Sequence, residues 1–67
     1  MTLERKIKLI EAMKASALKE YITAINDELY KSAAFNQGYA YALDNVLDIL
    51  NNEEFTQVLI DTYMKGE

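Results

Sequence analysis

The chain has 67 residues, carries a formal net charge of −4 and contains no histidine, cysteine, proline or tryptophan. The lack of histidine and cysteine excludes disulfides, imidazole and thiolate metal sites, and the commonest catalytic bases and nucleophiles. A chain this short forms one domain, 1–67, whose core alone supplies no more than ~3–5 kcal/mol. We therefore expect a homodimer to bury additional apolar surface.

The charges are unevenly distributed along the chain. Residues 1–20 hold five Lys or Arg against three Glu, whereas residues 21–67 hold two Lys against eight Asp or Glu. This acidic majority favours basic protein partners over direct binding of nucleic acid, although ordinary solvated helix faces produce the same balance. The longest hydrophobic run covers only residues 39–43, and the N-terminus lacks a signal-peptide core. We expect a cytoplasmic protein that does not enter a membrane.

The first predicted helix covers residues 2–31. Thr2 suits its N-cap, and apolar residues recur at helical spacing as far as Leu29. Lys14 lies within this apolar stripe, where we expect its stem to be buried and its ammonium group to reach solvent. Leu9 and Met13 widen the stripe beyond what one neighbouring helix covers, which predicts a second neighbour.

The second predicted helix covers residues 34–50 and follows a turn at 31–34. Gly38 costs about 1 kcal/mol relative to alanine inside a helix, so its use needs a reason. It lies between Ala34 and Ala42, and these three residues form an edge with almost no side chain. This edge predicts close approach of another helix; in the alternative, the N-terminus of the helix is frayed and Gly38 belongs to a loop. The expected core face carries Phe35, Tyr39, Leu43, Val46, Leu47 and Leu50.

The third predicted helix covers residues 52–65. Asn51 and Glu54 resemble a capping box that stops one helix and starts the next. Ile60 and Met64 lie nearly opposite the main apolar face, so this helix is either enclosed by neighbours or presents a surface to a partner.

These elements predict an all-α fold in which the long N-terminal helix forms an antiparallel helical hairpin with the second helix, followed by a shorter C-terminal helix. We expect this hairpin to dimerise into a helical bundle. The helix lengths leave two arrangements open for the third helix. It either folds back to make a three-helix bundle or continues the second arm of the hairpin.

Catalytic and metal-binding interpretations find little support among the residues present. Asp44 and Asp48 lie one turn apart, but on the expected solvent face, without the pocket that separates the pKa values of a working carboxylate pair. The chain has neither a calcium-binding loop of the Asp-x-Asn/Asp type nor a glycine-rich phosphate loop. We therefore predict a protein that is not an enzyme and that holds no cofactor or metal.

The remaining polar and aromatic residues are compatible with a protein-binding surface, although two exposed tyrosines also occur on ordinary small domains. Tyr30 and Tyr41 point away from the expected core faces, and tyrosines with flanking carboxylates are typical of protein interfaces. The predicted partner-binding set comprises Tyr30, Tyr41, Asp27, Glu28, Asp44, Asp48, Glu53, Glu54 and Asp61. The predicted helix-packing or oligomer set comprises Ala34, Gly38, Ala42, Leu9, Met13, Ile60 and Met64.

The segment "FNQGYAYALDNVLDIL", preceded by "ALKEYITAINDEL", resembles short accessory open reading frames of phages and mobile elements of low-GC Gram-positive bacteria. The resemblance covers residues 17–50 and implies a small protein of the host cytoplasm that binds and redirects a host or defence protein. The resulting hypothesis is an inhibitor or modulator of a nucleic-acid-handling protein, with DNA-like charge mimicry as one mode. The alternatives are a small DNA-binding regulator led by the basic start of the first helix, and a structural homo-oligomeric subunit.

Overall fold

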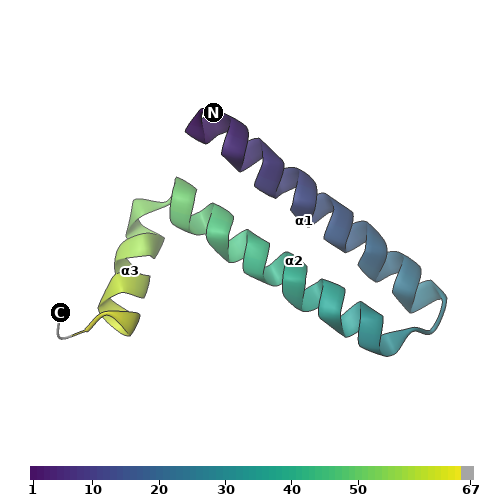
Figure 1. Cartoon of the computed structure of the whole chain (residues 1–67). Helices are drawn as coiled ribbons and strands as arrows, with labels where there is room; N and C mark the ends of the chain where they lie inside the picture. Colours follow the sequence, from purple (N-terminus) through teal and green to yellow (C-terminus); the bar gives the residue numbers. More distant parts are fainter. Residues whose placement is uncertain (66–67) are drawn as a thin grey trace.

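The computed structural model describes residues 1–65 and folds them into three α-helices. These are α1 (Leu3–Asn26), α2 (Tyr30–Asn51) and α3 (Glu53–Tyr63). The chain reverses after α1, so that α2 returns alongside it as a helical hairpin, and α3 extends from the far end of α2 (Figure 1). The described part of α3 packs against α2 but not against α1. The all-helical prediction and the hairpin are confirmed, and α3 does not fold back over α1.

The N-terminus of α1 is capped as the sequence predicts. The hydroxyl oxygen of Thr2 accepts a hydrogen bond of 3.2 Å from the backbone N–H of Arg5. Glu4 lies in the first turn, where a carboxylate interacts favourably with the positive end of the helix dipole. The first helix therefore begins at Leu3 for a local reason that the sequence already contains.

The turn between α1 and α2 lies at residues 27–29, rather than at 31–34 as predicted. Asn26 and Asp27 are poor helix formers, because their side chains compete for backbone hydrogen bonds. Glu28 adopts a left-handed backbone conformation with φ of 58°. Its N–H donates to the carbonyl of Ile25 (3.1 Å), and the N–H of Leu29 donates to the carbonyl of Ala24 (2.8 Å). These two bonds form a Schellman motif, which ends the helix five residues earlier than predicted.

The break between α2 and α3 falls within "NNEEF", as predicted, but one residue later than the expected cap. Asn52, rather than Asn51, accepts a hydrogen bond of 3.0 Å from the backbone N–H of Phe55. The side chain of Asn51 instead donates to the carbonyl of Leu47 (2.9 Å) within α2. The hydroxyl of Thr56 also donates to the carbonyl of Ile49 (2.7 Å), which ties the start of α3 to the end of α2. Helix α3 ends at Tyr63, two residues before the predicted end.

Alanines form the seam between α1 and α2. Among the described residues, the buried side chains are those of Ala17 and Ala24 on α1, and of Ala33, Ala40 and Leu47 on α2. Within each helix these positions are spaced by seven residues, so they stay on one side of the helix over two turns. Their small side chains allow the two backbones to approach closely. Helical spacing places Ala17 and Leu47 on the apolar faces of their helices, as observed, but the prediction did not include Ala24, Ala33 and Ala40.

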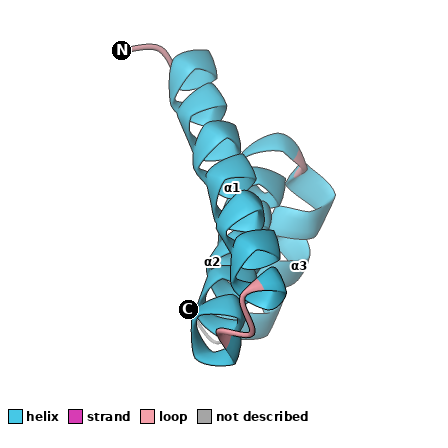
Figure 2. Ribbon diagram, turned by 90° about the vertical axis from the view of Figure 1, so that its right-hand side faces the viewer, coloured by secondary structure: helices cyan, strands magenta, loops and turns pink. Residues whose placement is uncertain are grey.

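The larger apolar residues surround this seam rather than fill it. Ile7, Ile10, Tyr21 and Leu43 are half-buried at the seam. Phe35, which the sequence places on the core face of the second helix, is instead 68% exposed. The α1–α2 pair forms one layer: the molecule measures 45 × 30 × 15 Å, and Figure 2 shows α1 in front of α2, with α3 to one side of the pair. Among the described residues, α3 contacts α2 but not α1, so no third helix covers the seam.

Candidate interaction surfaces

Shallow hollows on the two flanks of the hairpin mark its candidate interaction surfaces. Helical spacing sorts the residues beside the seam into two sets, one on each flank. One set surrounds Met13, and the other surrounds Tyr41. A third hollow lies between α2 and α3. Each is open to solvent and lined largely by apolar side chains, so all three are suited to binding proteins rather than to enclosing a substrate.

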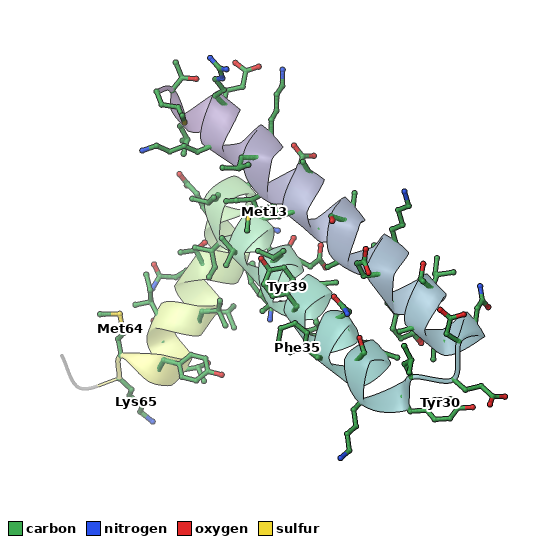
Figure 3. All side chains as sticks on the ribbon, turned by 45° about the vertical axis from the view of Figure 1, so that its right-hand side comes forward. Met13, Tyr30, Phe35, Tyr39, Met64 and Lys65 are labelled. Atoms are coloured by element: carbon green, nitrogen blue, oxygen red, sulfur yellow. The ribbon has the colours of Figure 1, made fainter. Side chains whose placement is uncertain are left out.

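The Met13 face is defined by Leu9 and Met13 on α1 and by Phe35, Tyr39, Ala42 and Val46 on α2, with Lys6 and Glu20 as its charged residues. Met13, Ser16, Glu20, Phe35 and Tyr39 line a hollow of about 310 Å³ on it. The rings of Phe35 and Tyr39 stack with centroids 6.0 Å apart. Figure 3 shows Met13, Tyr39 and Phe35 in a row along the hairpin. The exposed fractions of Leu9 and Met13, 56% and 37%, agree with the expectation that α2 alone does not cover them.

The Tyr41 face is the opposite flank, defined by Leu18 and Ile22 on α1, Tyr30 and Tyr41 on α2, and the carboxylates of Glu4, Glu11, Asp44 and Asp48. The Lys14 ammonium group bonds to Asp44 Oδ1 at 2.6 Å, across the two helices. The side chain of Lys14 is 33% exposed, and its ammonium group is paired with the half-exposed carboxylate of Asp44. Leu18, Gln37 and Tyr41 line a hollow of about 170 Å³ next to this ion pair.

The exposure of the two tyrosines agrees with the sequence reading. Tyr41 is 72% exposed and Tyr30 is 65% exposed. Tyr41 lies beside the Lys14–Asp44 pair, whereas Tyr30 begins α2 at the turn, as labelled in Figure 3. The structure therefore places a tyrosine, a carboxylate and aliphatic side chains together around Tyr41. Whether they contact a partner stays a prediction.

The hollow between α2 and α3 has a volume of about 400 Å³. Ile49 on α2 and Phe55, Leu59, Ile60, Tyr63 and Met64 on α3 line it. None of the described residues of α3 is buried, and Tyr63 is 81% exposed. Ile60 and Met64, which the sequence placed opposite the main apolar face of this helix, share the hollow with Phe55 and Leu59. The two apolar sides of α3 therefore meet at one open surface.

The predicted acidic residues do not form a single cluster. Asp27 and Glu28 lie in the turn, Asp44 and Asp48 lie on α2, and Glu53, Glu54 and Asp61 lie on α3. Asp44 pairs with Lys14, and Asp61 accepts a hydrogen bond of 2.9 Å from the side chain of Gln57. Within residues 1–65, no group of three or more carboxylates is arranged to hold a metal ion.

The edge formed by Ala34, Gly38 and Ala42 is not the contact between α1 and α2. A Cβ atom built on Gly38 would have no neighbouring heavy atom within 4 Å, and both Ala34 and Ala42 are exposed. Gly38 nevertheless lies in the interior of α2, so the alternative of a frayed N-terminus does not apply. Close approach at this edge stays a prediction for a second chain only.

Sequence reasoning missed several residues that shape these surfaces. Asn36 occupies a half-buried position at the seam, where its side chain donates to the carbonyl of Ser32 (2.9 Å). A seven-residue repeat of Ala33, Ala40 and Leu47 on α2, matched by Ala17 and Ala24 on α1, could have identified the seam from the sequence.

Comparisons of the chain with protein-family models, with curated proteins and with solved structures find no match. Among residues 1–65, no helix combines the length and the apolar character that crossing a bilayer requires. The surfaces described above are therefore the basis for a functional proposal.

Proposed function

We propose that this chain works by binding proteins: two copies pair into a helical bundle, and the surface that remains binds a further protein. The observation that carries the proposal is the single layer of helices. Stable domains bury an apolar face between at least two layers, and this chain supplies one. Its radius of gyration is 14.8 Å, compared with about 11 Å for a compact domain of this length.

The exposed area supports the same proposal. The chain exposes 5602 Å², whereas a compact folded monomer of 7.7 kDa exposes about 4,300 Å². The excess is roughly 1,300 Å² per chain, compared with about 800 Å² that each partner buries in a standard interface. A dimer that buried this excess on both chains would reach roughly 2,600 Å², which is in the range of obligate homodimers.

The Tyr41 face is the proposed site for the further protein, and its chemistry selects a partner with a basic surface. Tyrosine side chains supply contact area at a low cost in conformational entropy, and they are enriched among the interface residues that contribute most of the binding free energy. The carboxylates Glu11, Asp44 and Asp48 surround Tyr41 and Leu18 at helical spacing, and the chain as a whole carries −4. Opposite charges on a partner would raise the association rate and fix the orientation of binding.

The narrower form of the proposal is a phage-type inhibitor or modulator of a host or defence nucleic-acid-handling protein in the host cytoplasm. Its support is the resemblance over residues 17–50 together with the acidic charge. DNA-like mimicry is less well supported than a local contact around Tyr41, because the acidic residues are spread over the turn, α2 and α3. The structural-subunit alternative retains one specific support, the open apolar hollow between α2 and α3.

Multi-angle light scattering after size-exclusion chromatography tests the pairing. Between about 1 and 100 µM protein, we expect a mass of two chains and a melting temperature that rises with concentration, because association stabilises the folded state by mass action. A mass of one chain at every concentration, with an unchanged melting temperature, would refute the proposed pairing.

Affinity capture from a bacterial lysate tests the second step, with Tyr41→Ala as the variant and Tyr63→Ala as the matched control on α3. We expect Tyr41→Ala to lose the captured protein and Tyr63→Ala to retain it. Capture should weaken as salt rises from about 0.05 to 0.5 M, since exposed charges are screened over a few ångströms at high salt. Equal capture by both variants would remove the Tyr41 face as the site. A gel shift of random duplex DNA at low salt would instead support the DNA-binding alternative.

A further inference from the structure

We infer that the proposed dimer forms through the Met13 face, with two copies stacked about a two-fold axis that crosses the hairpin at the level of Met13. This inference rests on the proposed pairing and adds to it the face, the symmetry and the residues that oppose one another. A two-fold interface uses the same patch on both chains, so the patch must be complementary to itself. The residues of the Met13 face satisfy this requirement.

The charges on α1 are placed symmetrically about Met13. Lys6 precedes Met13 by seven residues and Glu20 follows it by seven, at positions that recur on one side of the helix. An axis through Met13 therefore sets Lys6 of one copy against Glu20 of the second copy, twice in the dimer. At the centre, the two Met13 side chains meet. Leu9 of one copy lies at the level of Ala17 of the other, one residue from the small side chain of Ser16.

The apolar residues on α2 obey the same symmetry. Lys14 reaches Asp44 at 2.6 Å, so residue 44 is at the level of Met13 along the hairpin. An axis at this level sets Ala42 of one copy at the level of Val46 of the second copy. A larger residue thus opposes a smaller one, and the positions that recur on this flank of α2 carry no charge between Ser32 and Val46, with Lys31 next to the turn.

The Tyr41 face is a poor candidate for the dimer interface because most of its charges are negative. It carries Glu4, Glu11, Asp44 and Asp48, against Lys8 and a Lys14 already bonded to Asp44. A two-fold axis at the same level would set Asp44 of one copy against Asp44 of the other, and like charges at close range are unfavourable. Charge therefore assigns the second copy to the Met13 face and leaves the Tyr41 face for a partner of opposite sign.

The test compares Leu9→Glu with Ile22→Glu, two exposed aliphatic residues on opposite flanks of α1. Their exposed fractions are nearly equal, 56% and 58%, so an effect on the fold of one chain would be similar in both. We expect Leu9→Glu to raise the dimer dissociation constant at least 100-fold in sedimentation equilibrium, and Ile22→Glu to change it less than 3-fold, since only the first buries a charge in the interface. The reverse ranking, in a protein that still dimerises, would overturn the inference while leaving the proposed pairing intact.

Charge reversal and crosslinking keep the inference testable if Leu9→Glu fails to fold. Lys6→Glu and Glu20→Lys should each raise the dissociation constant at least 5-fold, and the double variant should restore it. A zero-length carbodiimide crosslink between Lys6 and Glu20 should form in the wild-type dimer, because within one helix these residues lie about 21 Å apart and cannot be joined. A dimer without this crosslink, or a double variant no better than the single ones, would refute the proposed axis. A wild-type monomer would refute the pairing as well.

Discussion

Helix α2 has two edges of small residues, of which one is buried and the other is exposed. Ala33 and Ala40 recur at a spacing of seven and are buried against α1, whereas Ala34, Gly38 and Ala42 recur at a spacing of four and face open space. The buried edge is opposed by Ala17 and Ala24, which carry the same seven-residue spacing on α1. Small residues therefore produce close packing where both helices supply them in register. Small residues on only one of the two helices do not produce close packing.

The largest effect should come from Leu47, the one large buried side chain at the seam. Leu47→Ala should lower the free energy of unfolding by about 2–5 kcal/mol, because it removes apolar contacts and leaves a cavity. Thermal melts followed by circular dichroism at a fixed protein concentration measure this loss. Val58→Ala on α3, where the side chain is 60% exposed, should change stability by less than about 0.5 kcal/mol. Similar losses for the two variants would show that the seam is not the core.

A direct test of the two edges replaces one alanine on each with leucine. Ala40→Leu should destabilise the protein by about 1–3 kcal/mol, because the added side chain forces the two helices apart. Ala34→Leu, on the same helix but exposed, should stay within about 0.5 kcal/mol. Chemical denaturation at equal concentration gives both values. If Ala34→Leu proved the more damaging, the outer edge would be the contact and the seam described here would be incorrect.

Gly38→Ala should stabilise the protein by about 1 kcal/mol, since alanine is the better helix former and no atom stands in the way of its Cβ. For a domain of this size the melting temperature should rise by about 4–8 °C. A fall in stability, seen only at concentrations where the protein associates, would instead show that this edge contacts a second chain. That result would restore the original expectation for Ala34, Gly38 and Ala42.

The smallest effect on stability is expected for the ion pair between Lys14 and Asp44. A double-mutant cycle with Lys14→Ala and Asp44→Ala should give a coupling free energy of about 0.2–1 kcal/mol, because the carboxylate is half exposed. The coupling should fall as salt rises to about 1 M. The exposed Lys8–Glu4 pair, at 3.7 Å within one helix, is the control and should show about 0.3–0.5 kcal/mol at most. A Lys14–Asp44 coupling that does not change with salt would contradict an exposed ion pair.

Much of the fold followed from local signals in the sequence. Thr2 caps α1, and the "NNEEF" segment separates α2 from α3. The turn was misplaced because the hydrophobic periodicity continues to Leu29, past the residues that end the helix. Glu28 in a left-handed conformation gives little sequence signal, since glycine is the usual residue there.

The candidate surfaces were less predictable than the helices. A wide hydrophobic stripe indicates that more than one neighbour is needed; Leu9 and Met13 are exposed in the single chain, and their contact with a second neighbour stays a prediction. Phe35 was assigned to the core face of the second helix, yet it lies away from the seam and is exposed on the Met13 face. Side-chain size predicts burial only when the number of layers is known, and a single sequence does not give that number.

The short connection at residues 27–29 also favours a high folding rate. Helical folds dominated by contacts between nearby parts of the chain fold within microseconds to milliseconds, because little loop-closure entropy opposes them. The hairpin can form progressively from its turn towards the chain ends, in a unimolecular step. In the proposed dimer, docking of the second copy is a separate bimolecular step whose rate scales with concentration. Stopped-flow refolding should therefore show a fast phase independent of concentration, followed by a slower one that accelerates as protein is added.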